Sequence, residues 1–361
     1  MDLRPSELQD ILRTSAADFF EREVSFERIR EIEAANRPDE QLHGQMTELG
    51  WNSLAISEDY GGQGGSVLDA GVLITQICRA ALPSPLASTL VGAVTIERHG
   101  DEELKSSLLP QLNSGLTISP ALLEASDSLY GPVTAEYADG ALTGEKRFVE
   151  FGETSDVHLV AAMQGDSPGL AVVRRDQPGV TARDTRTIGA LPQATVHYDG
   201  ASAEAWIEGE DAVETMRRLG SAVAAFETYC YAQKALDLTV DYVQMRVQFG
   251  QPIGAFQMVQ MRSADMATVV EGSRFLVHEL LWQIDEGLET RRQVALVKAI
   301  TAKMTPLVLQ DCHLLHGGIG YMQEYDLHFF TRRGRDAALR WGSARETMHI
   351  VTEEAFAAAS A

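Results

Sequence analysis

The chain is short of cysteine, of positive charge and of long apolar runs, and each shortage excludes a class of protein. Its three cysteines, Cys78, Cys230 and Cys312, are odd in number and far apart, which predicts reduced thiols rather than a disulfide framework. No run of 18 or more apolar residues is present, and the opening residues 1–5 do not resemble a signal peptide. No Cys/His spacing indicates a metal site. We therefore expect a soluble, cytoplasmic protein without a bound metal.

Basic residues are outnumbered by acidic ones, 30 Lys and Arg against 52 Asp and Glu, for a net charge of -22. This balance argues against nucleic acid and against an anionic membrane surface as partners. An anionic ligand would have to be held by a local basic cluster. The length, 361 residues, allows two or three packed modules, and 45% hydrophobic residues are typical of a globular protein.

Residues 1–115 have the apolar spacing of helices. Ser6 and Gln9 have the spacing of a capping box, and apolar residues follow at helical intervals as far as Phe20. Four glycines follow Tyr60, a composition that can cradle a phosphate. No strand and no GK[ST] follow them, so a flexible connector is the preferred interpretation. We expect an N-terminal helical domain here.

Residues 116–210 change to an alternating pattern of apolar and polar residues. Short β segments follow one another, and Asp139-Gly140 is a strong signal for a tight hairpin turn. The sequence therefore predicts a middle β-domain, either a barrel or a sandwich.

Residues 211–361 return to helical spacing. One helix from Asp211 to about Val247 would be roughly 54 Å long, more than a single domain needs. Such a length predicts a C-terminal four-helix bundle that also packs against other subunits. The fold class is thus α+β, with a helical domain on each side of a β-domain.

The segment YVQMRVQFGQPIGAFQMVQ, residues 242–260, contains the most distinctive corner of the chain. Gly250 and Pro252 interrupt the long helix, because glycine allows unusual φ angles and proline lacks an amide hydrogen. Arg246 and Gln257 flank the break, and a guanidinium beside an amide suits a phosphate and a heterocycle. A plain helical corner with a surface arginine is the competing interpretation.

The corner RVQFGQPIGAFQ resembles the R-x-x-F-G-x-x-I-x-x-F-Q segment of the acyl-CoA dehydrogenases, flavoproteins that desaturate acyl-CoA thioesters. Similarity extends over nearly the whole chain, including W-x-x-L-x-x-x-E-x-Y-G-G-x-G-G at residues 51–65. The resemblance implies the acyl-CoA dehydrogenase fold, FAD as cofactor, and an oligomer. It also implies that Arg246, Phe249 and Gln257 contact the FAD of a neighbouring subunit.

Two further segments resemble parts of the family's flavin site. Phe148 lies where the family has an aromatic residue against the flavin ring, and Gly317-Gly318 resembles a turn whose amides meet the FAD pyrophosphate. Some expected residues are replaced. Glu150 stands where a Thr is common, Leu314 replaces a Gln, and SPALLEASDS replaces a T-E-P-G segment.

The family's catalytic carboxylate is missing from both positions where it usually occurs. Desaturation needs a base that removes a proton beside the thioester carbonyl. At one position this chain has Trp341, and the other falls near Gly220. Glu227, in the apolar stretch AAFETYCYA, is a weak candidate for a relocated base, because burial would raise its pKa. Glu124 and Glu150 are weaker candidates still. Arg340, which precedes Trp341, is no base, because a guanidinium stays protonated.

Three hypotheses remain open from the sequence. The chain is a flavoenzyme with a relocated base, a non-catalytic subunit that completes the site of a related chain, or a scaffold without flavin. Mixed tetramers of related subunits occur among the family members that act on bulky, steroid-like CoA thioesters. The resemblance therefore implies an acyl-CoA substrate, a homo- or hetero-tetramer, and an electron-transfer flavoprotein as acceptor.

Overall fold

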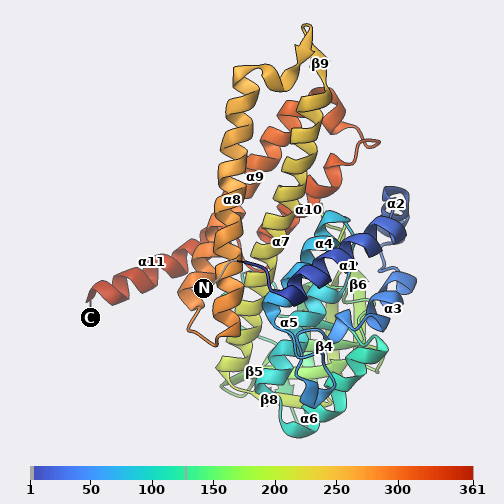
Figure 1. The fold of residues 1–361 in the computed structure, drawn as a ribbon. Helices are drawn as coiled ribbons and strands as arrows, with labels where there is room; N and C mark the ends of the chain where they lie inside the picture. The colour runs from blue at the N-terminus through green and yellow to red at the C-terminus, as the bar shows by residue number, and fades with distance from the viewer. Residues whose placement is uncertain (1–3, 127, 361) are drawn as a thin grey trace.

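A computed structural model describes residues 4–126 and 128–360 of the chain (Figure 1). Residues 1–3, on which part of the signal-peptide argument rests, lie outside the described residues, as do Asp127 and Ala361. In chain order the fold consists of a group of helices, a sheet, and a second and longer group of helices. The predicted α+β class is confirmed.

The N-terminal region is helical, and its helices begin at capping side chains, except for one that follows Pro85 without a side-chain cap. Ser6 and Gln9 form the predicted capping box, with backbone to side-chain bonds of 3.1 Å in both directions. One helix was not predicted separately: Ser25 caps it, and Asn36 ends it in a left-handed conformation with φ 52°. The helices of this region are α1 (Glu7–Glu23), α2 (Phe26–Ala35), α3 (Glu40–Glu48), α4 (Val67–Arg79), α5 (Leu86–His99) and α6 (Glu102–Leu108).

The glycine-rich loop before α4 is held by its own backbone. Gly62, Gly64 and Gly65 donate their amides to carbonyls within residues 54–57 at 2.8–2.9 Å. A side chain on Gly62 would place its Cβ 2.0 Å from the Ile56 carbonyl oxygen, so this position requires glycine. The loop is therefore a tightly bonded connector, not a flexible one, and these amides are not free to bind a phosphate.

The middle region forms one mixed sheet that folds around its own core. The strands are β1 (Ile118–Ala121), β2 (Glu136–Ala138), β3 (Ala141–Glu150), β4 (Val157–Gln164), β5 (Ser167–Arg174), β6 (Val180–Asp184), β7 (Gln193–Ser202) and β8 (Ala205–Glu208). Their order is β6-β7-β3-β2-β4-β5-β8, with β1 beside β4. Asp139 and Gly140 form the predicted turn, both at positive φ (51° and 80°). Side chains of β3 and β7 pack against those of β4 and β5 in one cluster.

The C-terminal helices form the bundle that rises above the sheet in Figure 1. They are α7 (Glu210–Met245), α8 (Gln257–Asp285), α9 (Arg291–His316), α10 (Leu327–Leu339) and α11 (Ala344–Ser360). The spacing of apolar residues predicts one buried stripe on α7, but every residue from 219 to 232 is buried. The reason is that α7 has neighbours all around it: α8, α9 and α10 on the bundle side, and α4 and α5 from the N-terminal region.

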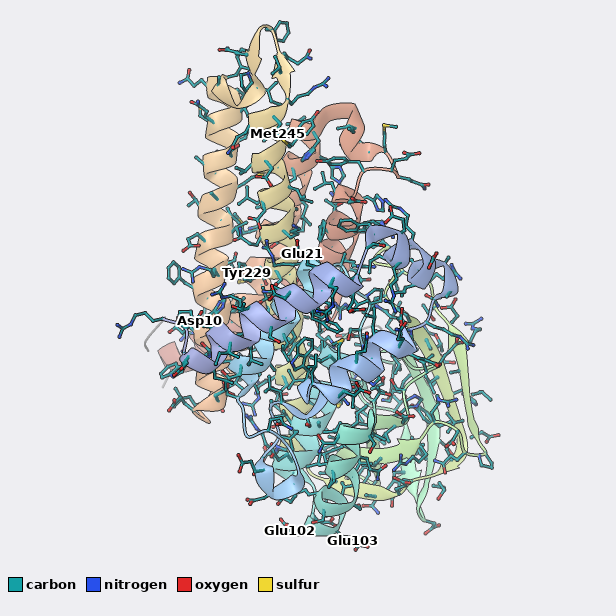
Figure 2. All side chains as sticks on the ribbon, turned by 45° about the vertical axis from the view of Figure 1, so that its right-hand side comes forward. Asp10, Glu21, Glu102, Glu103, Tyr229 and Met245 are labelled. Atoms are coloured by element: carbon teal, nitrogen blue, oxygen red, sulfur yellow. The ribbon has the colours of Figure 1, made fainter. Side chains whose placement is uncertain are left out.

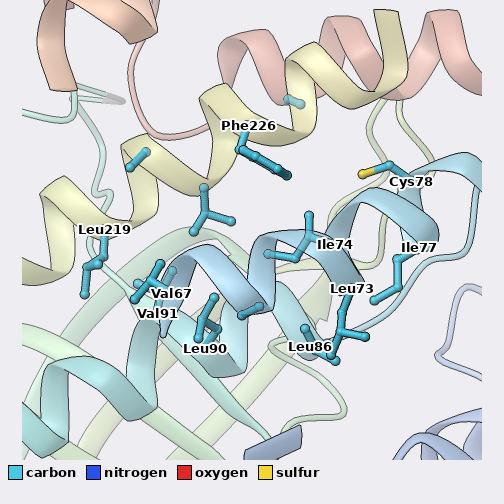
Figure 3. Close-up of a cluster of buried hydrophobic side chains, with 14 of the residues drawn as sticks. Val67, Leu73, Ile74, Ile77, Cys78, Leu86, Leu90, Val91, Leu219 and Phe226 are labelled. Atoms are coloured by element: carbon cyan, nitrogen blue, oxygen red, sulfur yellow. The ribbon is translucent and has the colours of Figure 1, made fainter. Parts of the chain in front are cut away.

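Close packing of α4 against α7 joins the N-terminal helices to the bundle. Figure 3 shows this apolar interface, with Ile74 of α4 near Phe226 of α7. A Cβ on Gly71 would lie 3.2 Å from the Phe226 ring and 3.1 Å from Leu281 of α8. A small residue at Gly71 therefore sets the distance between these helices.

The last helix, α11, packs against α9 at its start and then projects away from the body toward the C-terminus (Figure 1). Across the described residues, none of the helices combines the length and the hydropathy needed to cross a bilayer.

Candidate active site

The predicted flavin corner lies at the free end of the bundle. Helix α7 ends at Met245, and Arg246 is its C-cap. A short antiparallel hairpin of β9 (Val247–Gln248) and β10 (Gln251–Pro252) follows before α8 begins at Gln257. Phe249 and Gly250 form the turn at φ 53° and 84°. The predicted helix break is confirmed. Figure 2 shows Met245 at this end of the molecule, opposite Glu102 and Glu103.

The side chains of this corner point to solvent. Phe249 is 93% exposed, and its ring lies beside that of Phe256, with centroids 6.1 Å apart. Arg246 and Gln257 are also exposed. Within the described chain, no hydrogen bond or ion pair engages either side chain. The Arg246 guanidinium, the Gln257 amide and the Phe249 ring are thus exposed close together, where a ligand from outside this chain can reach them.

The glycine turn lies beside this corner. Tyr242, near the end of α7, donates from its hydroxyl to the His316 carbonyl at 3.4 Å, and the two rings stack at 4.4 Å. Gly317 and Gly318 follow directly and are exposed, with no atom within 4 Å of where a Cβ would lie. We call the set Arg246, Phe249, Gln257, Gly317 and Gly318 the bundle tip.

Phe148 lies apart from the bundle tip, at a cavity between the sheet and α10. The β3–β7 register shifts between Lys146 and Val149, and this bulge leaves Phe148 40% exposed at φ 53°. The cavity measures about 400 Å³. Its lining combines apolar, aromatic and charged side chains: Pro120, Leu122, Leu123, Arg147, Phe148, Glu150, Arg186, Thr187, Ile188, Gln193, Asp336, Leu339, Arg340 and Trp341.

The two positions that lack the expected carboxylate meet at this cavity. A Cβ on Gly220 of α7 would lie 2.3 Å from Cδ2 of the Trp341 indole, so the ring packs directly on the helix backbone. Ser221 Oγ donates to the Trp341 carbonyl at 2.8 Å. The sequence could not show that Gly220 and Trp341, 121 residues apart, are in contact. The Trp341 indole occupies the space beside Gly220.

Beside Trp341, three carboxylates surround one guanidinium. Arg340 donates to Glu150 at 2.7 Å, to Glu227 at 2.8 Å and to Asp336 at 2.9 Å. Although burial opposes its charge, these carboxylates hold the pKa of Arg340 well above its usual range. The Trp341 indole N–H donates to the second oxygen of Glu150 at 2.9 Å. We call Arg340, Trp341 and the three carboxylates the arginine cluster.

A buried lysine lies near this cluster. Lys298 of α9 is fully buried and donates to the carbonyls of Ala337 and Ala338 at 2.6 and 3.2 Å, at the end of α10. Burial, together with the charge of Arg340, lowers the pKa of Lys298 to about 7. Neither Lys298 nor the threefold pairing of Arg340 was predicted. The spacing of Asp336 and Arg340, four residues apart on one helix, was the available signal.

The candidate bases have different surroundings. Burial raises the pKa of Glu227, against the opposing effect of Arg340, but Glu227 does not line the cavity. Glu124 contacts Lys146 at 2.5 Å, and despite burial this lysine lowers its pKa. Glu150 lines the cavity, and its two oxygens accept hydrogen bonds from Arg340 and Trp341. Of the three, only Glu150 faces space that a ligand could occupy.

Comparison with known proteins agrees with the sequence resemblance. Residues 6–116 match the model of the acyl-CoA dehydrogenase N-terminal domain, and residues 208–353 match that of the acyl-CoA dehydrogenase C-terminal domain. An acyl-CoA dehydrogenase of Bacillus subtilis is 30% identical, over 90% of this chain and 91% of the relative. Acyl-CoA dehydrogenase IpdE2 of Mycolicibacterium smegmatis is 26% identical over 97% of this chain and all of the relative.

A solved structure described as the Tcur3481-Tcur3483 steroid ACAD G363A variant superposes with a TM-score of 0.91. It is 27% identical, and the match covers 98% of this chain and 99% of the other. The protein is therefore a flavoenzyme of the oxidoreductase class by fold and by descent. The chain belongs to the acyl-CoA dehydrogenase family, whose members bind FAD, act on acyl-CoA thioesters and form oligomers.

Proposed function

We propose that this chain is one subunit of an oligomeric FAD-dependent acyl-CoA dehydrogenase, in which a related chain carries the catalytic base. Its bundle tip contacts the FAD held by a neighbouring subunit. Residues 1–115, 116–210 and 211–361 act as an N-terminal helical domain, a middle β-domain and a C-terminal bundle. The assembly introduces a double bond next to the thioester of an acyl-CoA.

The observation that carries this proposal is the contact between Trp341 and Gly220. The indole occupies the space beside Gly220 where either family carboxylate would lie, so no carboxylate can be added there without moving the ring. An indole cannot accept a proton from carbon under ordinary conditions, because its nitrogen is only a donor. Proton removal in the assembly is therefore assigned to another chain.

The position of the bundle tip supports a shared flavin site. Trp341 packs on Gly220, and Arg246 lies 26 residues farther along α7, which corresponds to roughly 40 Å of helix. A ligand pocket of up to about 1,000 Å³ is only on the order of 10 Å across. The bundle tip and the cavity of one chain therefore serve two different places in an oligomer. Exposed Arg246 and Phe249 suit the tip for a neighbour's cofactor.

The chain's residues suit the parts of FAD in two ways. At the tip, the exposed Arg246 would pair with the pyrophosphate, and the exposed Gly317-Gly318 turn would let it approach the backbone closely, although the Gly317 amide itself donates to the His313 and Leu314 carbonyls. At the cavity, Phe148 offers an aromatic face to a flat ring. FAD, when bound, accepts a hydride from the acyl chain.

The substrate class follows from the same similarity. We assign a bulky, steroid-like CoA thioester, because the 27% identical structure is described as a steroid ACAD with two named components. We assign electron-transfer flavoprotein as the electron acceptor, as the family resemblance implies.

Replacing Arg246 by alanine in the oligomer tests this function. We expect FAD affinity, measured by titration of the deflavinated oligomer co-purified with its related chain, to fall about tenfold. The reason is that a charge-assisted contact contributes roughly 1.5–3 kcal/mol. Arg292→Ala is the control, since Arg292 is an exposed arginine at the opposite end of the bundle. Equal FAD affinity in both variants, or a stable monomer with full flavin content, would contradict the shared site.

A further inference from the structure

Another cavity, which we call the second cavity, lies between the N-terminal helices and the bundle. It measures about 200 Å³ and shares no lining residue with the cavity beside the arginine cluster. Glu227 and Tyr229 are two residues apart on α7, so their side chains leave the helix in nearly opposite directions. Glu227 reaches Arg340, whereas Tyr229 lines the second cavity. Figure 2 shows Tyr229 where α1 crosses the long helices.

The charge of the wall of the second cavity is the reverse of that of the whole chain. Arg4, Arg13 and Arg274 line it, and none of the described carboxylates does. Asp10 pairs with Arg13 at 3.0 Å. Glu271 pairs with Arg274 at 2.7 Å, and neither carboxylate is part of the wall. In a chain with 52 acidic and 30 basic residues, such a local basic cluster is what an anionic ligand requires.

Two buried polar side chains of this wall have no partner among the described residues. Tyr229 is 6% exposed, and Gln76 of α4 is 9% exposed. The Tyr229 hydroxyl and the Gln76 amide make no hydrogen bond within the described chain, yet neither group is fully covered. Because both residues line the second cavity, the small surface that each retains lies there. Buried polar groups are nearly always paired, so these donors indicate an acceptor that enters the cavity from solvent.

The Tyr229 ring is held in place by its neighbours. The rings of Phe226 and His278 each lie 6.0 Å from it, at interplanar angles of 70° and 76°. His278 in turn donates from Nδ1 to the Arg274 carbonyl at 2.7 Å. Burial raises the pKa of Tyr229, so its hydroxyl keeps its proton and serves as a donor. A fixed donor thus lies in the same wall as the guanidinium of Arg274.

The rest of the wall indicates the size and polarity of the ligand. Leu68 and Val72, one turn apart on α4, give the second cavity an apolar side. Its volume of about 200 Å³ lies below the roughly 300–1,000 Å³ of pockets for drug-sized ligands, so it holds neither FAD nor an acyl-CoA. A small anion with a compact apolar body matches both the donors and the apolar side.

We propose that the second cavity binds a small carboxylate with an apolar body. The Tyr229 hydroxyl and the Gln76 amide donate hydrogen bonds to the carboxylate, and Arg274 balances its charge. The apolar body packs on Leu68 and Val72. None of these residues belongs to the bundle tip or to the arginine cluster, so the site does not depend on the proposed function.

Tyr229→Phe tests the site, because phenylalanine keeps the ring and removes only the hydroxyl. The probes are benzoate, benzyl alcohol, which has the ring without the charge, and inorganic phosphate, which has the charge without the ring. Binding of each to the purified full chain is measured by calorimetry. We expect saturable binding of benzoate with a Kd on the order of 1 mM or tighter, as ligands of this size reach. Tyr229→Phe should weaken it about tenfold, the effect of one hydrogen bond to a charged group.

Two controls separate binding from folding. Tyr137→Phe, in β2 of the sheet and outside the second cavity, should leave the affinity for benzoate unchanged. Without ligand, Tyr229→Phe should unfold at the same temperature as the parent chain, since its hydroxyl has no partner within the described chain to lose. Benzyl alcohol and phosphate should each bind the parent chain at least about tenfold more weakly than benzoate.

Four outcomes would overturn the proposal: no saturable binding of benzoate, equal benzoate affinity in Tyr229→Phe, or binding of benzyl alcohol or of phosphate as tight as that of benzoate. None of these measurements needs flavin, the related chain or turnover. A failure of this proposal is therefore distinguishable from a failure of the shared-site function, which the Arg246 variant reports.

Discussion

At the scale of single residues, the polar groups of the site differ in whether they have hydrogen-bond partners within the chain. Arg340 and Glu150 are hydrogen-bonded to each other and to their neighbours, whereas the side chains of the bundle tip are exposed to solvent. Glu227 belongs to the first group. Its contact with Arg340 at 2.8 Å and its absence from the cavity wall favour a structural role over that of a relocated base.

The buried Lys298 gives a prediction on pH. Its pKa is about 7 in the folded chain against 10.5 when solvated, so between these values the unfolded chain binds a proton that the folded chain releases. Stability therefore rises with pH across this window, by up to about 1.4 kcal/mol per pH unit, and falls as pH drops toward 7. Lys298→Met should lack this rise in urea unfolding between pH 7 and 9. Exposed Lys303→Met, on the same helix, should keep it. Parallel curves for parent and Lys298→Met would refute the argument.

At the scale of helices and strands, local signals in the sequence predicted most of the fold. The capping box at Ser6, the turn at Asp139-Gly140 and the break after Met245 depend on adjacent residues, and each lies where expected. The complete burial of α7 was not predictable from its periodicity, because it depends on helices that pack from both sides. The contact of Gly220 with Trp341 was also not predictable, because it joins segments far apart in the sequence.

Two helix glycines offer a matched test of that contact. In α8, Gly272 has open space around it, and Gly272→Ala should raise the free energy of unfolding by about 0.5–1 kcal/mol. In α7, the new methyl of Gly220→Ala would meet the indole at 2.3 Å, so stability should fall by roughly 1–3 kcal/mol. Chemical denaturation measures both. A gain at Gly220 equal to that at Gly272 would mean that the indole does not pack there.

At the scale of the whole molecule, the proposed function divides the site of one chain into two halves, the bundle tip and the cavity. The bundle tip exposes Arg246 and Gln257 to solvent, while the Trp341 indole packs on Gly220, the two positions at which the family resemblance implies a base. Family resemblance indicated both halves from the sequence. Their separation along α7 and the arginine cluster at the cavity required the structure, since both arise from contacts between distant segments.

Anaerobic bleaching of bound flavin by a steroid-like acyl-CoA tests the central claim most directly. Losing a general base typically costs about 10²–10⁴ in rate, so this chain alone should bleach its flavin weakly or not at all. Addition of the related chain that carries the carboxylate should restore bleaching, and the restored rate should survive Glu227→Gln in this chain. Rapid bleaching by this chain alone, abolished by Glu150→Gln or Glu227→Gln with the fold intact, would contradict the account and identify a base within the chain.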